Sequence, residues 1–168
     1  VDKMAVFGEF TKKILIESGV KPEKIAVTGR PMWDNLVLKY NQSRKEGICK
    51  KLGIDVNKEI IVFATGPAYD EAEKRWILNC VFSAMKEFPE VQLINKLHPN
   101  ETGQLNELVA KEVAIDVVIT KNIDLFDLLS ACNVLINVQS TVALEAMLIG
   151  KPVIALKKSQ ELFYAIGI

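Results

Sequence analysis

The residues best able to do chemistry lie in a few short stretches, and the first of these holds the only histidine. His98 lies three residues after an apolar run that ends at Asn95. An imidazole there can donate to a phosphate oxygen or move a proton near neutral pH, and Pro99 stiffens the loop that presents the ring. We therefore predict that His98 is catalytic and phosphate-binding. The alternative is a histidine satisfied by a loop carbonyl.

The second stretch runs from Asn137 to Pro152, where a predicted strand leads into a predicted helix. Two hydroxyls, on Ser140 and Thr141, lie at the helix start, where free backbone N–H groups favour an anion such as a diphosphate. Glu145 shares a helix face with Thr141 and could accept from both hydroxyls of a ribose. We predict phosphate binding by the hydroxyl pair and ribose binding by Glu145. The alternative is a plain helix cap beside a solvated charge.

Two more turns follow predicted strands. Gly66 lets the backbone come close to a neighbour or a ligand, and we predict donor-phosphate binding there, although a plain strand-to-helix turn explains it equally well. At Asn122 and Ile123 we predict base binding, with backbone groups on the base edge and the aliphatic side chain on its face. Asp124 is equally explained as a helix N-cap. Neither the dinucleotide fingerprint nor the phosphate loop of P-loop ATPases is present.

Short β-branched runs alternate with stretches of helical period, which is typical of a parallel sheet with helices on both faces. Ligands of such sheets bind at the carboxyl ends of the strands, where all the candidates fall. The predicted strands are Met4 to Phe7, Ile25 to Thr28, Ile60 to Thr65, Val91 to Asn95, Val117 to Thr120, Val134 to Val138 and Val153 to Leu156. The predicted helices are Glu9 to Ser18, Arg44 to Leu52, Asp70 to Phe88, Leu105 to Val113, Asp124 to Cys132 and Ser140 to Ile149.

Two of these helices carry a predicted buried face. In the longest helix that face comprises Trp76, Ile77, Cys80, Val81, Ala84 and Phe88. In the last helix it comprises Ala143, Leu144, Met147 and Leu148.

Composition limits the class of protein. The 21 basic and 21 acidic side chains cancel, so nothing attracts the whole chain to nucleic acid or an anionic membrane. Three scattered cysteines, Cys49, Cys80 and Cys132, indicate reduced packing residues in a cytosolic protein. No apolar run approaches a membrane span, no signal peptide is visible and no metal-ligand cluster is present. We expect a cytoplasmic fragment of a longer protein, with no metal.

The stretch from Asn137 to Ile154 resembles the donor-site signature of GT-B-fold glycosyltransferases and of non-hydrolysing UDP-N-acetylglucosamine 2-epimerases. In these families a strand leads to a Ser/Thr or Gly pair, a helix with a glutamate and a Gly-Lys-Pro-Val-Ile ending. The segment from Lys24 to Asn35 is similar to their interdomain strand and loop, although Arg30 replaces the usual asparagine and receives no role. The Leu97-His98-Pro99 trio resembles the His-Pro motif of CDP-glycerol glycerophosphotransferases and bacterial sialyltransferases.

This resemblance implies an α/β, Rossmann-like doubly wound parallel sheet, the C-terminal half of a GT-B fold. Residues 1–22 are then the last strand and helix of an otherwise missing N-terminal acceptor-binding domain, or a linker. Residues 23–168 are the nucleotide-sugar-binding domain. The resemblance also implies that His98, Ser140 and Thr141 hold the phosphates of a sugar nucleotide or CDP-linked donor, and that no cofactor is needed. Peripheral contact with the inner face of the membrane, through the missing domain, stays open.

Three functions remain. The first is the donor-nucleotide-binding domain of a glycosyl- or glycerophosphotransferase in surface polysaccharide or glycoconjugate synthesis, inactive without its N-terminal domain. The second is a 2-epimerase, for which Asp70 and Glu71 are the nearest acid-base candidates. Epimerases usually have Ser-Gly-Gly where this chain has Ser140-Thr141-Val142, which favours the transferase. The third is a non-catalytic nucleotide-binding module.

Overall fold

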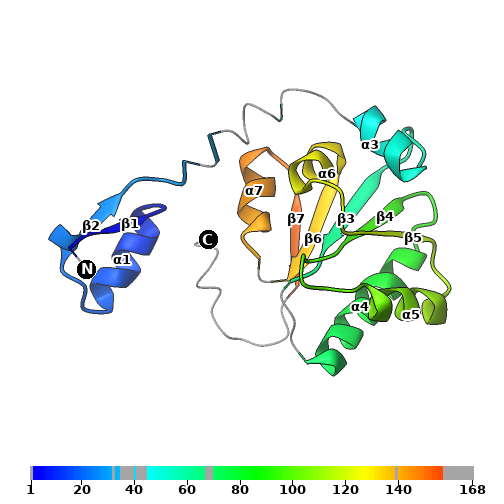
Figure 1. The fold of residues 1–168 in the computed structure, drawn as a ribbon, viewed down its shortest axis with the longest axis horizontal. Helices are drawn as coiled ribbons and strands as arrows, with labels where there is room; N and C mark the ends of the chain where they lie inside the picture. Colours follow the sequence, from blue (N-terminus) through cyan, green and yellow to red (C-terminus); the bar gives the residue numbers. More distant parts are fainter. Residues whose placement is uncertain are drawn as a thin grey trace.

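A computed structural model of the chain describes residues 2–31, 33–34, 40, 45–66, 70–138 and 140–156. These residues form a small unit at the start of the chain and a larger sheet domain (Figure 1). The small unit contains β1 (Met4–Val6), α1 (Glu9–Glu17), a 3₁₀ turn (Pro22–Lys24) and β2 (Ile25–Val27).

In the small unit, β1 and β2 pair in parallel, with Ala5 opposite Ala26. The second strand therefore belongs with the first 22 residues and does not enter the larger sheet. The domain boundary predicted between residues 22 and 23 falls inside this unit. A run of three apolar residues fits either sheet, so the sequence could not show which strand would be the partner of Ile25–Val27.

The larger domain is a five-stranded parallel sheet in the order β5-β4-β3-β6-β7. This confirms the predicted Rossmann-like α/β fold, and each strand ends within one residue of its predicted bounds. Its strands are β3 (Ile60–Ala64), β4 (Gln92–Lys96), β5 (Val117–Thr120), β6 (Val134–Val138) and β7 (Val153–Leu156). Its helices are α3 (Lys45–Leu52), α4 (Glu71–Lys86), α5 (Gln104–Val113), α6 (Leu125–Ala131) and α7 (Val142–Leu148).

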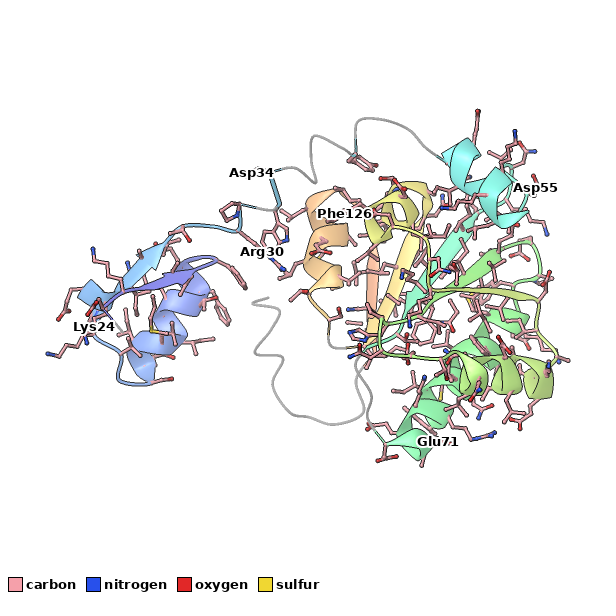
Figure 2. All side chains as sticks on the ribbon, in the orientation of Figure 1. Lys24, Arg30, Asp34, Asp55, Glu71 and Phe126 are labelled. Carbon is pink, nitrogen blue, oxygen red and sulfur yellow. The ribbon has the colours of Figure 1, made fainter. Side chains whose placement is uncertain are left out.

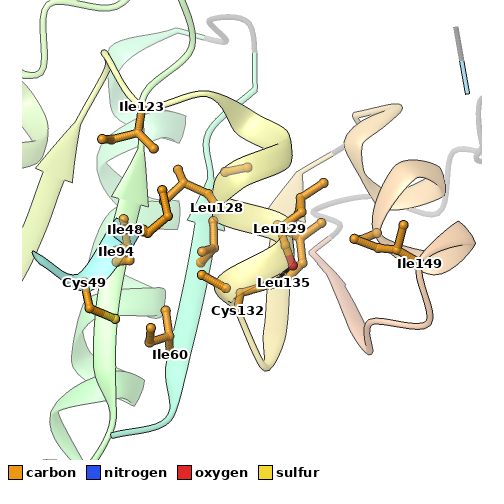
Figure 3. Close-up of a cluster of buried hydrophobic side chains, with 14 residues drawn as sticks. Ile48, Cys49, Ile60, Ile94, Ile123, Leu128, Leu129, Cys132, Leu135 and Ile149 are labelled. Carbon is orange, nitrogen blue, oxygen red and sulfur yellow. Dashed lines mark hydrogen bonds between the residues drawn. The ribbon is translucent and has the colours of Figure 1, made fainter. Parts of the chain in front are cut away.

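Helices cover both faces of this sheet. Residues of α3, α6 and α7 pack on one face (Figure 3), and α4 and α5 pack on the other. The alternation within β3 shows why both faces are apolar. Val62 packs with the residues of α3, α6 and α7, Phe63 packs with those of α4 and α5, and both are fully buried. Burial of such a side chain contributes about 1.5–3 kcal/mol each, so neither layer is dispensable.

The predicted buried face of α4 is partly wrong. Trp76 is 52% exposed and Cys80 is also exposed, as are Ala84 and Phe88. Apolar residues lie on more than one side of this helix, and the side that includes Leu78 packs against the sheet. The observed buried face is Ile77, Leu78, Val81, Phe82 and Met85.

The predicted buried face of α7 is also partly wrong, although Ala143 is buried as predicted. Met147 and Leu148 are exposed, whereas Ala143, Ala146 and Glu145 are buried. Small side chains let this short helix approach the sheet closely. The same rotation turns the carboxylate away from water.

Candidate functional site

Three of the predicted site segments meet at one edge of the sheet. Because β4, β3 and β6 are parallel neighbours, their carboxyl ends lie side by side. His98 follows β4, Gly66 follows β3 and Ser140 follows β6. The ends of β4 and β6, which flank β3, are about 10 Å apart, since neighbouring strands are spaced by about 4.8 Å. The structure thus brings the candidate phosphate-binding residues to one edge.

A buried carboxylate holds the backbone at His98. Glu101 is 6% exposed, and its Oε2 accepts the backbone N–H of His98 at 2.8 Å and the hydroxyl of Thr65. Its Oε1 lies 2.5 Å from Nζ of Lys74, which comes from α4. Sequence reasoning missed Glu101, because its three partners come from separate segments. The only signal was a glutamate three residues after the histidine.

The imidazole of His98 is tied to its own loop through one nitrogen. The backbone N–H of Asn100 donates to Nδ1 at 3.3 Å. Since Nδ1 accepts, this bond assigns the proton of the neutral ring to Nε2. The half-buried ring can therefore donate from Nε2. The tie is to a backbone N–H, not to the carbonyl that the alternative interpretation invoked.

Gly66 lies where the chain passes close to β6. A β-carbon at this position would be 2.9 Å from the carbonyl oxygen of Val138, too close for any side chain. This close approach explains the glycine by packing, and phosphate contact there stays a prediction. Pro67 and Ala68, the rest of the predicted turn, lie outside the described residues.

The hydroxyl pair at the start of α7 divides into two roles. Ser140 Oγ accepts the backbone N–H of Val142, the first residue of α7, at 3.3 Å, so this hydroxyl is used at the helix start, close to what the alternative interpretation held. The side-chain amide of Asn137 donates to the carbonyl oxygen of Ser140 at 3.2 Å and holds the turn. Thr141 is exposed, and its side chain makes no capping bond. Its hydroxyl is thus the more available of the two for a ligand.

Glu145 is buried, so the alternative of a solvated surface charge is wrong. Its Oε1 lies 4.0 Å from Nη1 of Arg30, which comes from the loop after β2. Burial raises the pKa of the Glu145 carboxyl, and the side chains of Trp33 and Arg30 oppose that rise. A buried carboxylate with few partners can accept hydrogen bonds from a polar ligand, such as a vicinal diol.

The base-binding prediction at Asn122 and Ile123 needs correction. Ile123 is 5% exposed and belongs to the core cluster that includes Leu128, so its side chain is not free to cover a base. Asn122 is exposed. The carboxylate of Asp124 accepts from the N–H groups of Phe126 and Asp127, which confirms its role as helix N-cap. What remains for a base is Asn122 and the backbone of this link.

Two lysines that sequence reasoning did not select add positive charge to this edge. Lys96, the last residue of β4, donates from Nζ to the carbonyl oxygen of Lys121 at 2.8 Å. Lys121 in turn donates to the carbonyl oxygen of Glu101 at 3.2 Å. Burial lowers the pKa of Lys96, with Asp124 opposing the shift. Both side chains suit an edge that receives an anion.

The opposite edge of the sheet, at the amino ends of the strands, has a cavity. It has a volume of about 270 Å³ and is lined by residues at the amino ends of β4 and β5, including Gln92 and Val118. None of the predicted site residues lines it, so we place the candidate site at the carboxyl edge on its chemistry. Within the described ranges no group of three potential metal ligands gathers. No helix there is long and apolar enough to cross a membrane.

Comparison with known proteins shows what this chain resembles. The model of the UDP-N-acetylglucosamine 2-epimerase family matches residues 4–165. Lipid-A-disaccharide synthases are also similar. The Geobacter sulfurreducens enzyme is 27% identical over 99% of this chain and 42% of its own length, and the Syntrophotalea carbinolica enzyme is 22% identical over 99% and 41%.

Solved structures show the same fold. UDP-GlcNAc 2-epimerase from Neisseria meningitidis, bound to UDP-GlcNAc, superposes with a TM-score of 0.73 at 18% identity, over 94% of this chain and 45% of that one. The wall teichoic acid polymerase TagF superposes with a TM-score of 0.62 at 18% identity, over 90% and 37%. The fold is therefore of the GT-B type, and the chain spans less than half the length of these relatives.

Proposed function

Because the chain belongs to the UDP-N-acetylglucosamine 2-epimerase family, we propose that it binds the nucleotide of a sugar-nucleotide or CDP-linked donor. We further propose that it does so as one domain of a GT-B-type glycosyl- or glycerophosphotransferase. The observation that carries this is the turn at Thr65 and Gly66. Its threonine hydroxyl accepts the backbone N–H of His98 at 3.1 Å, and its glycine approaches Val138 on the strand that leads to Ser140. This turn therefore contacts both the loop that carries His98 and the strand that leads to Ser140, and it fixes the two parts of the proposed phosphate site relative to each other.

In this proposal each residue acts on a different part of the nucleotide. His98 donates from Nε2 to a phosphate oxygen, and Thr141 with the start of α7 binds the other phosphate oxygens. Glu145 accepts from the ribose hydroxyls, and Asn122 contacts the base. Groups fixed in this way stabilise the negative charge that develops as the nucleotide leaves, which is the largest electrostatic demand of the transfer.

The other half of the reaction lies outside this chain in our proposal. An N-terminal domain, of which β1, α1 and β2 are the end, would bind the acceptor and supply the general base. We place the whole enzyme in the cytoplasm, at the inner face of the membrane where surface polysaccharide or glycoconjugate acceptors are built. The length of the relatives supports a second domain, since this chain covers 42% of the Geobacter enzyme.

A 2-epimerase is the second candidate, and the family match favours it. Epimerisation needs an acid and a base beside the sugar. Of the two carboxylates we predicted for that work, Asp70 caps α4 by accepting the N–H of Glu73 at 2.8 Å, and Glu71 is exposed on the first turn. Neither is held toward the carboxyl edge by a described contact. This supports the transferase, as does the name of both curated relatives.

Calorimetric titration with UDP tests the binding step. We expect His98→Ala and Glu145→Gln each to weaken UDP binding by about 10-fold or more, the effect of losing one charge-assisted hydrogen bond of about 1.5–3 kcal/mol. Trp76→Ala, at an exposed position on α4, is the control and should bind UDP like the parent. Equal affinity in all four proteins would contradict the site.

A second assay separates the two enzymes. The full-length protein is incubated with UDP-N-acetylglucosamine alone and with a lipid extract as acceptor source. A transferase releases UDP only when acceptor is present, whereas an epimerase forms the 2-epimer without any acceptor. Formation of the epimer would overturn the transferase proposal and leave the nucleotide site in place.

A further inference from the structure

Arg30 reaches from the small unit to the carboxylate of Glu145. Its guanidinium lies beside two neighbouring aromatic rings, 5.5 Å from the ring centre of Phe7 and 5.3 Å from that of Trp33. The two rings are themselves 5.9 Å apart. The backbone helps, because the N–H of Trp33 donates to the carbonyl oxygen of Arg30 at 2.9 Å and closes a turn. Figure 2 shows Arg30 on the segment that follows β2, between the small unit and α7.

This arrangement fixes the guanidinium before any ligand arrives. Two cation–π contacts restrict its orientation. The Arg30 side chain is 23% exposed and that of Glu145 is 8% exposed, so the pair is shielded from water. At 4.0 Å the guanidinium is close enough to act on the carboxylate, yet it leaves most of the carboxylate lone pairs for hydroxyl donors.

Among the residues that the structure describes, Arg30 is the charged side chain that acts on Glu145. The strands against which α7 packs, Val134–Val138 and Val153–Leu156, contain no charged residue. Lys151, just after the helix, donates to the carbonyl oxygens of Ser130 and Cys132 instead. Trp33 contributes a polar contact but no charge.

We infer that Arg30 is a positioning residue for ribose recognition, which holds the Glu145 carboxylate ionised and oriented and so couples the β1-α1-β2 unit to the nucleotide site. This rests on the proposed function, in which Glu145 accepts from the ribose. Arg30 is the residue that replaces the usual asparagine of the similar families, and the resemblance assigned no role to it. It also makes ribose binding depend on where the small unit sits.

The inference has a pH signature whose sign follows from the chemistry. A carboxylate accepts from two hydroxyls, whereas a protonated carboxyl does so poorly. Burial raises the pKa of Glu145, so preference for a ribose should be lost as the pH falls through that raised value. Without the positive charge of Arg30 the pKa of Glu145 rises further, and the loss should occur at higher pH.

The experiment compares UDP with 2′-deoxy-UDP across a pH series. Both probes carry the same phosphates, so their affinity ratio isolates the ribose contact. In Arg30→Met, which keeps an unbranched chain beside the rings but no charge, we expect the midpoint of the ratio to move to higher pH than in the parent. Arg30→Lys restores charge and should lie near the parent. Arg75→Met, at an exposed ion pair with Glu112, is the matched control and should match the parent.

If Glu145→Gln keeps the parent's UDP preference and pH profile, the ribose assignment in the proposed function fails. If Glu145→Gln abolishes the preference but Arg30→Met keeps the parent's midpoint, the inference about Arg30 is overturned. A shift in Arg30→Met that Arg30→Lys does not reverse would show a packing role only, which also overturns it.

A ligand-free measurement covers the case in which Arg30→Met folds poorly. Phe7→Leu removes one ring of the stack at an exposed position. Compared with Glu145→Gln, the parent should lose stability to urea as the pH rises from the ordinary glutamate pKa through the raised value, because folding favours the protonated form. In Phe7→Leu this loss should extend to higher pH. Identical pH dependence in Phe7→Leu and the parent would count against the inference.

Discussion

Oε2 of Glu101 accepts the backbone N–H of His98 at 2.8 Å, so a buried carboxylate fixes the loop that presents the imidazole. Through Lys74 the same carboxylate joins this loop to α4, a helix that contributes no residue to the proposed nucleotide contacts. The orientation of the ring therefore depends on a helix on one face of the sheet, and stability and binding should be linked through Glu101.

Removal of Glu101 should destabilise the domain strongly. Glu101→Ala leaves the Thr65 hydroxyl, the His98 N–H and the Lys74 ammonium without their shared acceptor, and breaking a buried ion pair in this way costs about 3–5 kcal/mol. Glu101→Gln keeps an acceptor oxygen and should cost about 1–3 kcal/mol. Urea unfolding followed by circular dichroism measures both. Glu112→Ala, in a half-exposed pair, is the control at about 0–1 kcal/mol. Similar losses for Glu101→Ala and Glu112→Ala would contradict the role of Glu101.

Two glycines should respond oppositely to alanine. Gly66→Ala places a β-carbon 2.9 Å from a backbone oxygen, which cannot move without shifting β6, and should cost about 1–3 kcal/mol and weaken UDP binding. Gly47 lies within α3 with nothing near its β-carbon position. Gly47→Ala should therefore stabilise the fold by about 0.5–1 kcal/mol. Thermal melts compare the two, and a neutral Gly66→Ala would show that the edge has room to relax.

The corrected face of α4 can be tested with two aromatic residues on the same helix. Phe82 is fully buried between α4 and the sheet, so Phe82→Ala should cost about 3–5 kcal/mol. Trp76 is largely exposed, and Trp76→Ala should change stability by no more than about 0.5 kcal/mol. A larger loss at Trp76 than at Phe82 would restore the face predicted from the sequence.

The cysteines should differ in reactivity. Burial raises the pKa of Cys132 to about 11 and also raises the pKa of Cys49, so both thiols stay protonated and inaccessible at pH 8. Cys80 is exposed on α4. Titration with Ellman's reagent should find one fast thiol in the native protein and three after unfolding in urea. Fast reaction of all three would mean that the core opens readily.

Much of the site could be located from the sequence because it depends on strand ends. A strand is a local property, and parallel strands place their carboxyl ends at one edge, so His98, Gly66 and Ser140 were predicted together. The prediction at Ile123 failed for the opposite reason. Whether an aliphatic side chain after a strand faces a ligand or the core depends on the helix packed over it, here α6.

Side-chain partners across long separations could not be predicted. Glu145 and Arg30 are 115 positions apart (145 − 30), and their contact exists only because the small unit stands beside α7. Lys74, which pairs with Glu101, lies on α4, where the orientation that exposes Trp76 also turns Lys74 inward. A helix with apolar residues on several sides has no single buried face until a sheet selects one.

By itself, the sequence determined the alternation of strands and helices, the sheet class and the edge that carries the chemistry, since these follow from hydrophobic period and from residues at strand ends. Only the tertiary structure decided which strands pair, which face of each helix is buried and which charges meet. Those choices depend on free energies of packing and ion pairing between segments far apart in the chain, and no local pattern encodes them.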